Sequence, residues 1–232
     1  MNRGYQEERD LIEVYTRAQV VASIVWLHGL GVGGSDMDGL ITNMSRSREI
    51  GLHHLAPNAP LRRITVNNGR PARAWYDVLG DPAEVPRDEA GIGDSHGRIT
   101  RLLNAERQRG IPSEHTVLGG FSQGAAMALH CGLRYPQPLG GIVVLSGELL
   151  LPERLADERH PANAKTPILM IHGTADEAVP VADAARSRDQ LRELGYTVEW
   201  VEFPAGHTVP MDAVAKVDAW VYESLEPAAS AV

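Results

Sequence analysis

The feature that most constrains the fold of this chain is the alternation of apolar, strand-like runs with segments of helical periodicity. Strands are predicted at 20–29, 53–57, 62–68, 114–121, 140–147, 166–173 and 196–204. The runs at 140–147 and 166–173 are continuously apolar, which is typical of parallel sheets covered on both faces. Helices are predicted at 35–48, 91–110, 123–135, 181–195 and 210–225. This order predicts an α/β fold with a mostly parallel, doubly wound sheet and helices on both faces.

Composition and charge exclude several classes of protein. The net charge of −8 over 232 residues argues against a nucleic-acid partner and against attraction to an anionic membrane. Residues 1–10 lack the apolar core of a signal peptide, and no run is long enough to span a membrane. The single cysteine, Cys131, cannot form an internal disulfide. We therefore expect a cytoplasmic protein with one domain over 1–232, whose tail frays from about residue 226.

A pentapeptide of the form G-x-S-x-G, Gly120-Phe121-Ser122-Gln123-Gly124, joins a predicted strand to a predicted helix. Its glycines leave room for a tight turn, and the helix that follows points its positive end at negative charge on the serine. Ser122 is thus a candidate nucleophile. The pattern alone is a weak signal, because a glycine-rich turn that happens to contain serine has the same form.

A nucleophilic serine needs a base, and the base needs an acid that orients it. At a strand–turn–helix site of this kind, the chain order is serine, acid, histidine. His207 follows a predicted strand, whereas His172 ends an apolar strand and His160 lies in a polar stretch. His207 is therefore the candidate base. Asp176, in the loop after the preceding strand, is the candidate acid, and Glu177 is the next choice.

Acyl transfer also requires N–H donors for the oxyanion of the tetrahedral intermediate. The backbone N–H of Gln123, directly after the candidate nucleophile, is one expected donor. The strand at 20–29 runs into a glycine-rich loop, and the N–H of Leu30 in this loop is the expected second donor. Such loops also bind phosphate, but the loop has neither the G-x-x-x-x-G-K-[ST] nor the G-x-G-x-x-G pattern. Three elements in the correct order favour a hydrolase.

The chain resembles the carboxylesterase, phospholipase and acyl-protein thioesterase family of α/β hydrolases. The stretches that carry the resemblance are WLHGLG, APNAPLRRITVNNGRPARAWYD, GIPSEHTVLGGFSQGAAMAL, LSG, PILMIHGTADEAVP and FPAGHTV. The resemblance implies a triad of Ser122, Asp176 and His207, with an oxyanion hole lined by Leu30 and Gln123. It also implies a compact α/β-hydrolase fold without a cap domain, and a homodimer is frequent in such enzymes.

Departures from the family pattern lie outside the triad and bear on substrate preference. Val32 stands where aspartate is common, Glu177 where proline is common, and Asn58 where histidine is frequent, while PAGH replaces PMGH. The residues expected to bind substrate are Trp75, Tyr76, Leu149 and Val179. Ordinary packing explains the two aromatic residues equally well, and a loop pinned to the core explains Leu149.

The connection between the strands that end at 147 and begin at 166 is too short for a cap domain, and its prolines break helices. An open, shallow site is therefore expected. The function predicted is a serine carboxylesterase for short-to-medium acyl esters or thioesters, which acts through an acyl-enzyme without a metal or organic cofactor. Several alternatives use the same triad: an acyl-protein thioesterase, a lysophospholipase, an acyltransferase or a peptidase. A non-catalytic binding module of this fold is a further alternative.

Overall fold

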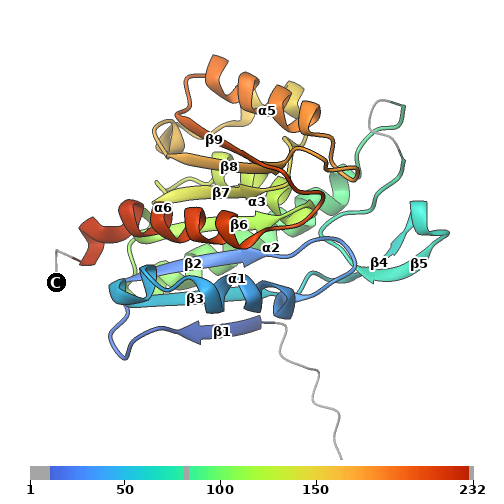
Figure 1. Cartoon of the computed structure of the whole chain (residues 1–232). Helices are drawn as coiled ribbons and strands as arrows, with labels where there is room; N and C mark the ends of the chain where they lie inside the picture. Colours follow the sequence, from blue (N-terminus) through green and yellow to red (C-terminus); the bar gives the residue numbers. More distant parts are fainter. Residues whose placement is uncertain (1–10, 81–83, 230–232) are drawn as a thin grey trace, which may run out of the picture.

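The computed structural model describes residues 11–80 and 84–229, and its centre is a seven-stranded sheet of order β1-β3-β2-β6-β7-β8-β9 (Figure 1). The strands are β1 (Leu11–Tyr15), β2 (Ala22–Leu27), β3 (Leu52–Pro57), β6 (Thr116–Phe121), β7 (Gly141–Leu145), β8 (Ile168–Gly173) and β9 (Val198–Phe203). Every neighbouring pair is parallel except β1 with β3. The predicted mostly parallel sheet is confirmed.

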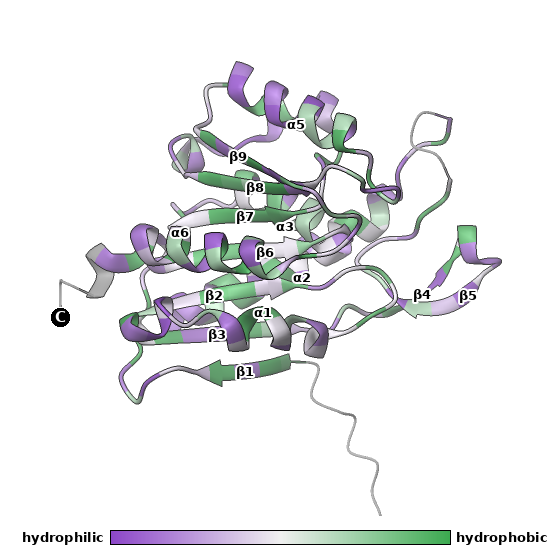
Figure 2. Cartoon of the chain, in the orientation of Figure 1, coloured by the Kyte–Doolittle hydropathy of each residue, from purple (hydrophilic) through white to green (hydrophobic). Residues whose placement is uncertain are grey.

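Helices cover both faces of this sheet, as predicted. One face carries α2 (Glu89–Gln108), α3 (Gln123–Arg134), α4 (Leu155–Glu158) and α5 (Val181–Glu193), and the other carries α1 (Asp38–Asn43) and α6 (Met211–Ala229) (Figure 1). Each face has its own buried cluster: Val25 and Leu27 of β2 belong to the first, and Ile24 and Trp26 to the second. This alternation is the two-residue period of a strand. Figure 2 shows the resulting layer of hydrophobic strands between helices with polar outer faces.

The segment predicted as one helix over 35–48 is instead divided into three short elements. They are the 3₁₀ turn η1 (Gly34–Met37), the helix α1 and the 3₁₀ turn η2 (Ser47–Ile50). The carboxylate of Asp218, on α6, accepts hydrogen bonds from the backbone N–H groups of Arg46 (2.7 Å) and Ser47 (2.8 Å). These N–H groups therefore bind a distant side chain instead of continuing the helix.

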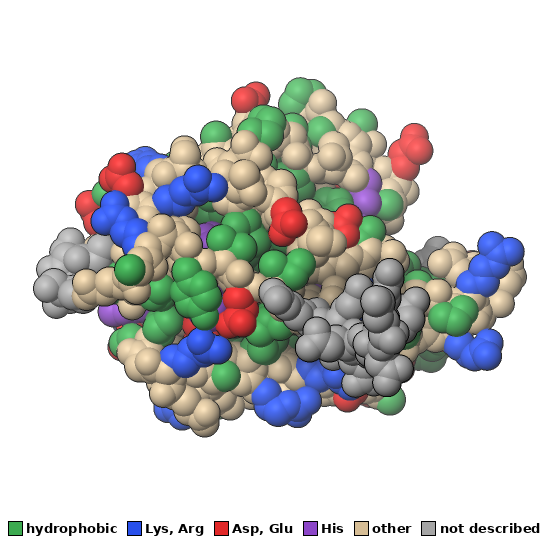
Figure 3. Space-filling model, turned by 90° about the horizontal axis from the view of Figure 1, so that it is seen from below, with side chains coloured by type: hydrophobic (Ala, Val, Ile, Leu, Met, Phe, Trp, Pro, Cys, Tyr) green, Lys and Arg blue, Asp and Glu red, His purple; other side chains and the backbone are tan. Residues whose placement is uncertain are grey.

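Two further elements differ from the prediction. The edge strand β1 was not predicted, and the strand predicted over 62–68 stops early, at the end of β4 (Leu61–Ile64). A 3₁₀ turn, η3 (Thr65–Asn67), and β5 (Arg70–Arg73) complete a hairpin that projects beside the main sheet (Figure 1). Basic side chains lie at the tip of this hairpin, and charges of both signs are scattered over the face seen in Figure 3.

The connection from β7 to β8 carries no cap domain. It holds only η5 (Pro152–Arg154), α4 and η6 (Pro161–Asn163). Elsewhere in the chain, the 3₁₀ turn η4 (Ser113–His115) precedes β6. Helix α6 continues to Ala229, so 226–229 are helical where a frayed tail was predicted; 1–10 and 230–232 lie outside the described residues. Within the described ranges, no helix has the length and apolarity needed to cross a membrane.

Candidate active site

Ser122 lies at the carboxyl end of β6, where α3 begins and where the strand order reverses between β2 and β6. Ligands of doubly wound sheets bind at such a switch point. Its backbone, at φ 56° and ψ −122°, is in a region that non-glycine residues rarely occupy. A Cβ on Gly124 would lie 2.1 Å from the carbonyl oxygen of Leu27, and a Cβ on Gly120 would lie 2.5 Å from the Gly124 carbonyl group. The motif glycines therefore let β6, β2 and α3 meet closely enough to hold the serine on this turn.

Three predicted side chains form one continuous chain of hydrogen bonds. His207, in the loop after β9, places Nε2 2.8 Å from the Ser122 Oγ and Nδ1 2.7 Å from the Asp176 Oδ2. Because a carboxylate only accepts hydrogen bonds, Nδ1 carries the proton and donates to it. Nε2 is then the acceptor for the serine hydroxyl. The Asp176 side chain is fully buried, whereas that of His207 is 26% exposed and reaches the surface.

The loop after β8 holds Asp176 in its ionised form. Its Oδ1 accepts hydrogen bonds from the N–H groups of Ala178 and Val179, each at 2.9 Å. Burial raises the pKa of this carboxyl, but the hydrogen bonds from Val179, His207 and Ala178 lower it by more, so the pKa lies below its ordinary value. His172 donates through Nε2 to the Val179 carbonyl (2.8 Å) and thereby fixes the same loop.

The alternative acid and bases from the sequence do not take part in this chain of hydrogen bonds. Glu177 is exposed, and the hydrogen bond of His207 goes to its neighbour Asp176. His160 caps the η6 turn by accepting from the Ala162 N–H (3.2 Å). His172, predicted to shape the end of its strand, serves the loop rather than the serine.

The two backbone N–H groups predicted for the oxyanion stand beside the serine. Leu30, Gln123 and Ser122 line the same cavity. Gln123 is the first residue of α3, and the first N–H groups of a helix have no partner within it. Neither of the two N–H groups has an acceptor among the described residues. Both are therefore free to donate to a ligand.

His28 anchors the loop that carries Leu30. Its Nε2 accepts from the Ala59 N–H at 2.9 Å, so its Nδ1 carries the proton and donates to the Gly29 carbonyl at 2.7 Å. Burial lowers the pKa of His28, which keeps the ring in this neutral form. The loop is held further by the Gly31 N–H, which donates to the Arg73 carbonyl of β5 at 2.8 Å.

The side chain of Gln123 has a structural role that the sequence did not reveal. Its Oε1 accepts from the Trp75 N–H and its Nε2 donates to the Tyr76 carbonyl, both at 2.8 Å. Trp75 in turn donates through Nε1 to the His28 carbonyl at 2.8 Å and is 1% exposed. The prediction that Trp75 lines the groove is therefore corrected: its ring is buried and braces the loop before Leu30.

Comparison with known proteins agrees with this geometry. The sequence profile of the family described as Phospholipase/Carboxylesterase matches residues 12–225. The chain belongs to this family.

Three relatives illustrate the membership. Acyl-protein thioesterase 1 of Gibberella zeae is 36% identical over 219 residues, which cover 90% of this chain and 93% of that protein. Carboxylesterase SOBER1 of Arabidopsis thaliana is 32% identical over 210 residues, or 89% and 92% of the two chains. The crystal structure of Zea mays acyl-protein thioesterase 2 matches with a TM-score of 0.83 at 29% identity, covering 94% and 99%. The protein is thus a serine hydrolase of the esterase and thioesterase class.

Two cavities of this hydrolase lie on either side of the Ser122–His207 hydrogen bond. The first, called here the serine cavity, has a volume of about 550 Å³. Its lining includes Leu30, Tyr76, Ser122, Gln123, Glu177 and Val179. The second, the apolar cavity, has about 390 Å³. Its lining includes Gly29, Leu40, Phe121, His207, Val209 and Val214.

Of the four residues predicted to bind substrate, Tyr76 and Val179 line the serine cavity, but Trp75 and Leu149 do not. Leu149 is 4% exposed, packs in the core, and donates its backbone N–H to the Ser187 Oγ at 3.0 Å. The loop after β7 is therefore pinned down rather than folded over the serine, which corrects the prediction for Leu149. In the described part of the chain, no group of three or more His, Cys, Asp or Glu residues is arranged to hold a metal ion.

Proposed function

We propose that the protein is a serine carboxylesterase that hydrolyses short-to-medium acyl esters, and thioesters by the same route, through an acyl-enzyme on Ser122. The observation that carries the proposal is the continuous hydrogen-bonded chain from Asp176 through His207 to Ser122, which opens into a cavity beside two free N–H groups. The relatives named as acyl-protein thioesterases and as a carboxylesterase support both kinds of substrate.

The reaction uses each group at a defined atom. The Ser122 Oγ attacks the acyl carbonyl carbon while the His207 Nε2 accepts the hydroxyl proton. The carbonyl oxygen becomes an oxyanion that accepts hydrogen bonds from the Leu30 and Gln123 N–H groups. As the intermediate collapses, His207 returns the proton to the departing alcohol or thiol, and the acyl group stays on the serine. Water then repeats the cycle, with Asp176 stabilising the imidazolium in both halves.

The two cavities give the substrate a direction. Since His207 protonates the leaving group, the alcohol or thiol part lies on the His207 side, where the apolar cavity is. The acyl part then lies in the serine cavity, which contains Ser122 and both N–H donors. This cavity is bordered by the charged groups Arg87, Glu148, Glu177 and Asp183. A long apolar acyl chain would desolvate these charges, which favours short-to-medium acyl groups.

An active-site probe tests the proposal. A fluorophosphonate reporter is expected to label the folded protein stoichiometrically, and heat denaturation is expected to abolish the labelling. Ser122→Ala is expected to fold normally, to lose labelling, and to hydrolyse butyrate esters at least about 10³-fold more slowly. Ser45→Ala, at an exposed serine on the α1 side, is the matched control and retains both. Near-normal hydrolysis by Ser122→Ala would overturn the assignment, and a folded protein that never labels would favour a binding module.

A further inference from the structure

His172 is a buried histidine that contacts two parts of the loop carrying Asp176. Its side chain, near the end of β8, is 1% exposed. Its Nε2 lies 2.8 Å from the Val179 carbonyl oxygen and 3.5 Å from the Asp176 Oδ2. Because a carbonyl oxygen only accepts hydrogen bonds, this nitrogen carries a proton. One N–H group thus binds the backbone of the loop and lies beside the carboxylate that the same loop presents.

The Asp176 carboxylate is surrounded by N–H groups and its side chain is fully buried. Its Oδ1 accepts from the backbone of Ala178 and Val179, each at 2.9 Å, and its Oδ2 accepts from the His207 Nδ1 at 2.7 Å. At 3.5 Å the His172 Nε2 is too far from Oδ2 for a full hydrogen bond, but an N–H dipole acts over this distance in a buried site. Oδ2 therefore lies between two imidazole rings.

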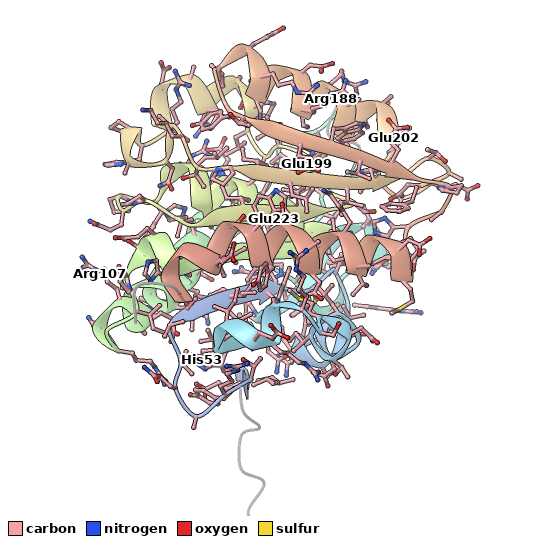
Figure 4. All side chains as sticks on the ribbon, turned by 60° about the vertical axis from the view of Figure 1, so that its left-hand side comes forward. His53, Arg107, Arg188, Glu199, Glu202 and Glu223 are labelled. Atoms are coloured by element: carbon pink, nitrogen blue, oxygen red, sulfur yellow. The ribbon has the colours of Figure 1, made fainter. Side chains whose placement is uncertain are left out.

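The other charged groups around His172 are bound to partners of their own. Glu202 is opposite His172 in the β8–β9 register, and its Oε1 accepts from the Trp200 Nε1 at 2.8 Å (Figure 4). Arg188, on α5, forms two hydrogen bonds with Asp189 and lies 4.9 Å over the Trp200 ring. The rings of Trp200 and His172 are nearly parallel, with centroids 6.1 Å apart. Within the described part of the chain, the carboxylate beside the His172 N–H group is that of Asp176.

We propose that His172 is a positioning residue for the triad, which acts through Asp176 and does not touch the substrate. Its N–H group fixes the loop through the Val179 carbonyl and shares part of the Oδ2 charge that His207 uses. The inference rests on the proposed function, because it takes Ser122, His207 and Asp176 as the working triad. It adds a limit on how strongly the carboxylate holds the imidazolium.

This sharing of charge has a definite sign. An N–H group beside a carboxylate stabilises the negative charge, so Asp176 attracts the proton on His207 less strongly. Without that N–H group, the carboxylate stabilises the imidazolium more, and the ring keeps its proton to a higher pH. Since the base must be neutral to accept the serine proton, the acid limb of kcat/KM moves to higher pH. A merely structural loss would loosen the Asp176–His207 contact and leave the limb in place or move it to lower pH.

Two substitutions separate the N–H donor from the rest of the ring. His172→Leu removes the donor, whereas His172→Gln can place an amide N–H where Nε2 stands. With a butyryl ester, His172→Leu is expected to raise the midpoint of the acid limb by about 0.4 pH units, the lower end of what one hydrogen bond supplies. Its kcat is expected to fall by about tenfold, because the loop is less well fixed. His172→Gln is expected to restore the wild-type midpoint.

A second buried histidine provides the matched control. His54 lies on β3, and its Nδ1 accepts from the Trp26 Nε1 at 3.2 Å, away from the triad. His54→Leu leaves that N–H group without an acceptor and is expected to lower Tm, while the acid limb keeps its midpoint. Nuclear magnetic resonance titration of the His207 ring measures the same midpoint without turnover. If His172→Leu does not fold, His172→Asn replaces it, because its side chain is too short to place a donor at the Nε2 position.

The outcomes keep the two proposals apart. A wild type that hydrolyses no ester would overturn the proposed function, and the His207 resonances would still decide the role of His172. A midpoint that does not move when the donor is removed would overturn that role. An equal rise in His172→Gln would overturn it as well, because the donor would then not be the cause. The same rise in His54→Leu would trace the shift to lost stability and would also overturn the role.

Discussion

The serine cavity and the apolar cavity meet at one hydrogen bond but are built from opposite faces of the sheet. The serine cavity takes its walls from α3, the loop after β7 and the start of α5, and it includes four charged residues. The apolar cavity takes its walls from η1, α1 and the start of α6, with Asp36 as its one acidic residue. The loop segment Gly29-Leu30, which follows β2, divides the two cavities, because Gly29 lines the apolar cavity and Leu30 the serine cavity.

This division has a consequence for specificity. In the substrate orientation that we propose, the acyl part and the leaving group contact side chains that do not pack on one another, since the central sheet separates their supports. Substitutions at distant, independent sites usually add in free energy. Preference for the acyl group and preference for the leaving group are therefore expected to vary independently, while changes at the junction affect all substrates alike.

The largest effect is expected at the Asp176–His207–Ser122 chain of hydrogen bonds, where the two cavities meet. Asp176→Asn is expected to lower kcat by about 10⁴-fold for every ester, because an amide no longer enforces the tautomer in which Nδ1 of His207 carries the proton. Glu177→Gln, one residue along, changes only the charge of the serine cavity and is expected to alter kcat/KM by less than about tenfold. Steady-state kinetics on a butyryl ester compares the two. If Glu177→Gln proved to be the inactive variant, the choice of acid would be wrong.

The sequence predicted the junction better than it predicted the walls. Ser122, Asp176 and His207 each follow a predicted strand, and parallel strands bring their carboxyl ends to one edge of the sheet. Their proximity thus depends on strand order alone. The edge strand β1, with the sequence LIEVY, escaped prediction because it is only five residues long, although most of its residues are apolar. Cytoplasmic location and a homodimer stay predictions.

The walls depend on contacts that no local pattern records. Trp75 is an aromatic residue of the kind that often lines a groove. It is buried because the Gln123 side chain and the His28 carbonyl fix its position. Leu149 is pinned by Ser187, 38 positions away in the sequence. The helix predicted over 35–48 is interrupted by a carboxylate from α6. Each error comes from long-range hydrogen bonds that override a local preference.

A matched pair of conservative substitutions tests whether the two cavities bind different parts of the substrate. Val32→Thr places a hydroxyl in the lining of the apolar cavity, and Val78→Thr does the same in the serine cavity. Each is expected to lower kcat/KM by up to about tenfold, because a hydroxyl against an apolar group is poorly solvated. Val32→Thr is expected to penalise long alcohols at a fixed acyl group, and Val78→Thr long acyl groups at a fixed alcohol. Equal penalties in both series would show that the cavities do not act separately.

The smallest expected effect is on the pH dependence of stability, through His28, which holds the Gly29-Leu30 loop between the two cavities. Burial lowers the pKa of His28, while the unfolded chain has the ordinary value of about 6.5. Below that pH the unfolded state binds more protons, so the stability that His28 contributes is complete above about pH 6.5 and is lost as pH falls through the folded pKa. Burial, and then the charges of His53 and Arg48, lower the pKa of His54 to about 4. Its contribution to stability is therefore also lost as pH falls. The two histidines differ in position, because His28 holds the Gly29-Leu30 divider and His54 binds the Trp26 Nε1 at 3.2 Å.

Glutamine at either position retains a hydrogen-bond acceptor and removes the titration. Both His28→Gln and His54→Gln are expected to flatten the fall in Tm between about pH 6.5 and pH 4, each by about 2–4 °C, the shift that 1 kcal/mol gives in a chain of this size. Only His28→Gln is also expected to lower kcat, because Leu30 loses its anchored loop. Scanning calorimetry across pH, with butyrate hydrolysis at pH 8, separates the two. A His54→Gln variant that lost activity as severely as His28→Gln would show that acid sensitivity reaches the active site through the sheet and not through the divider.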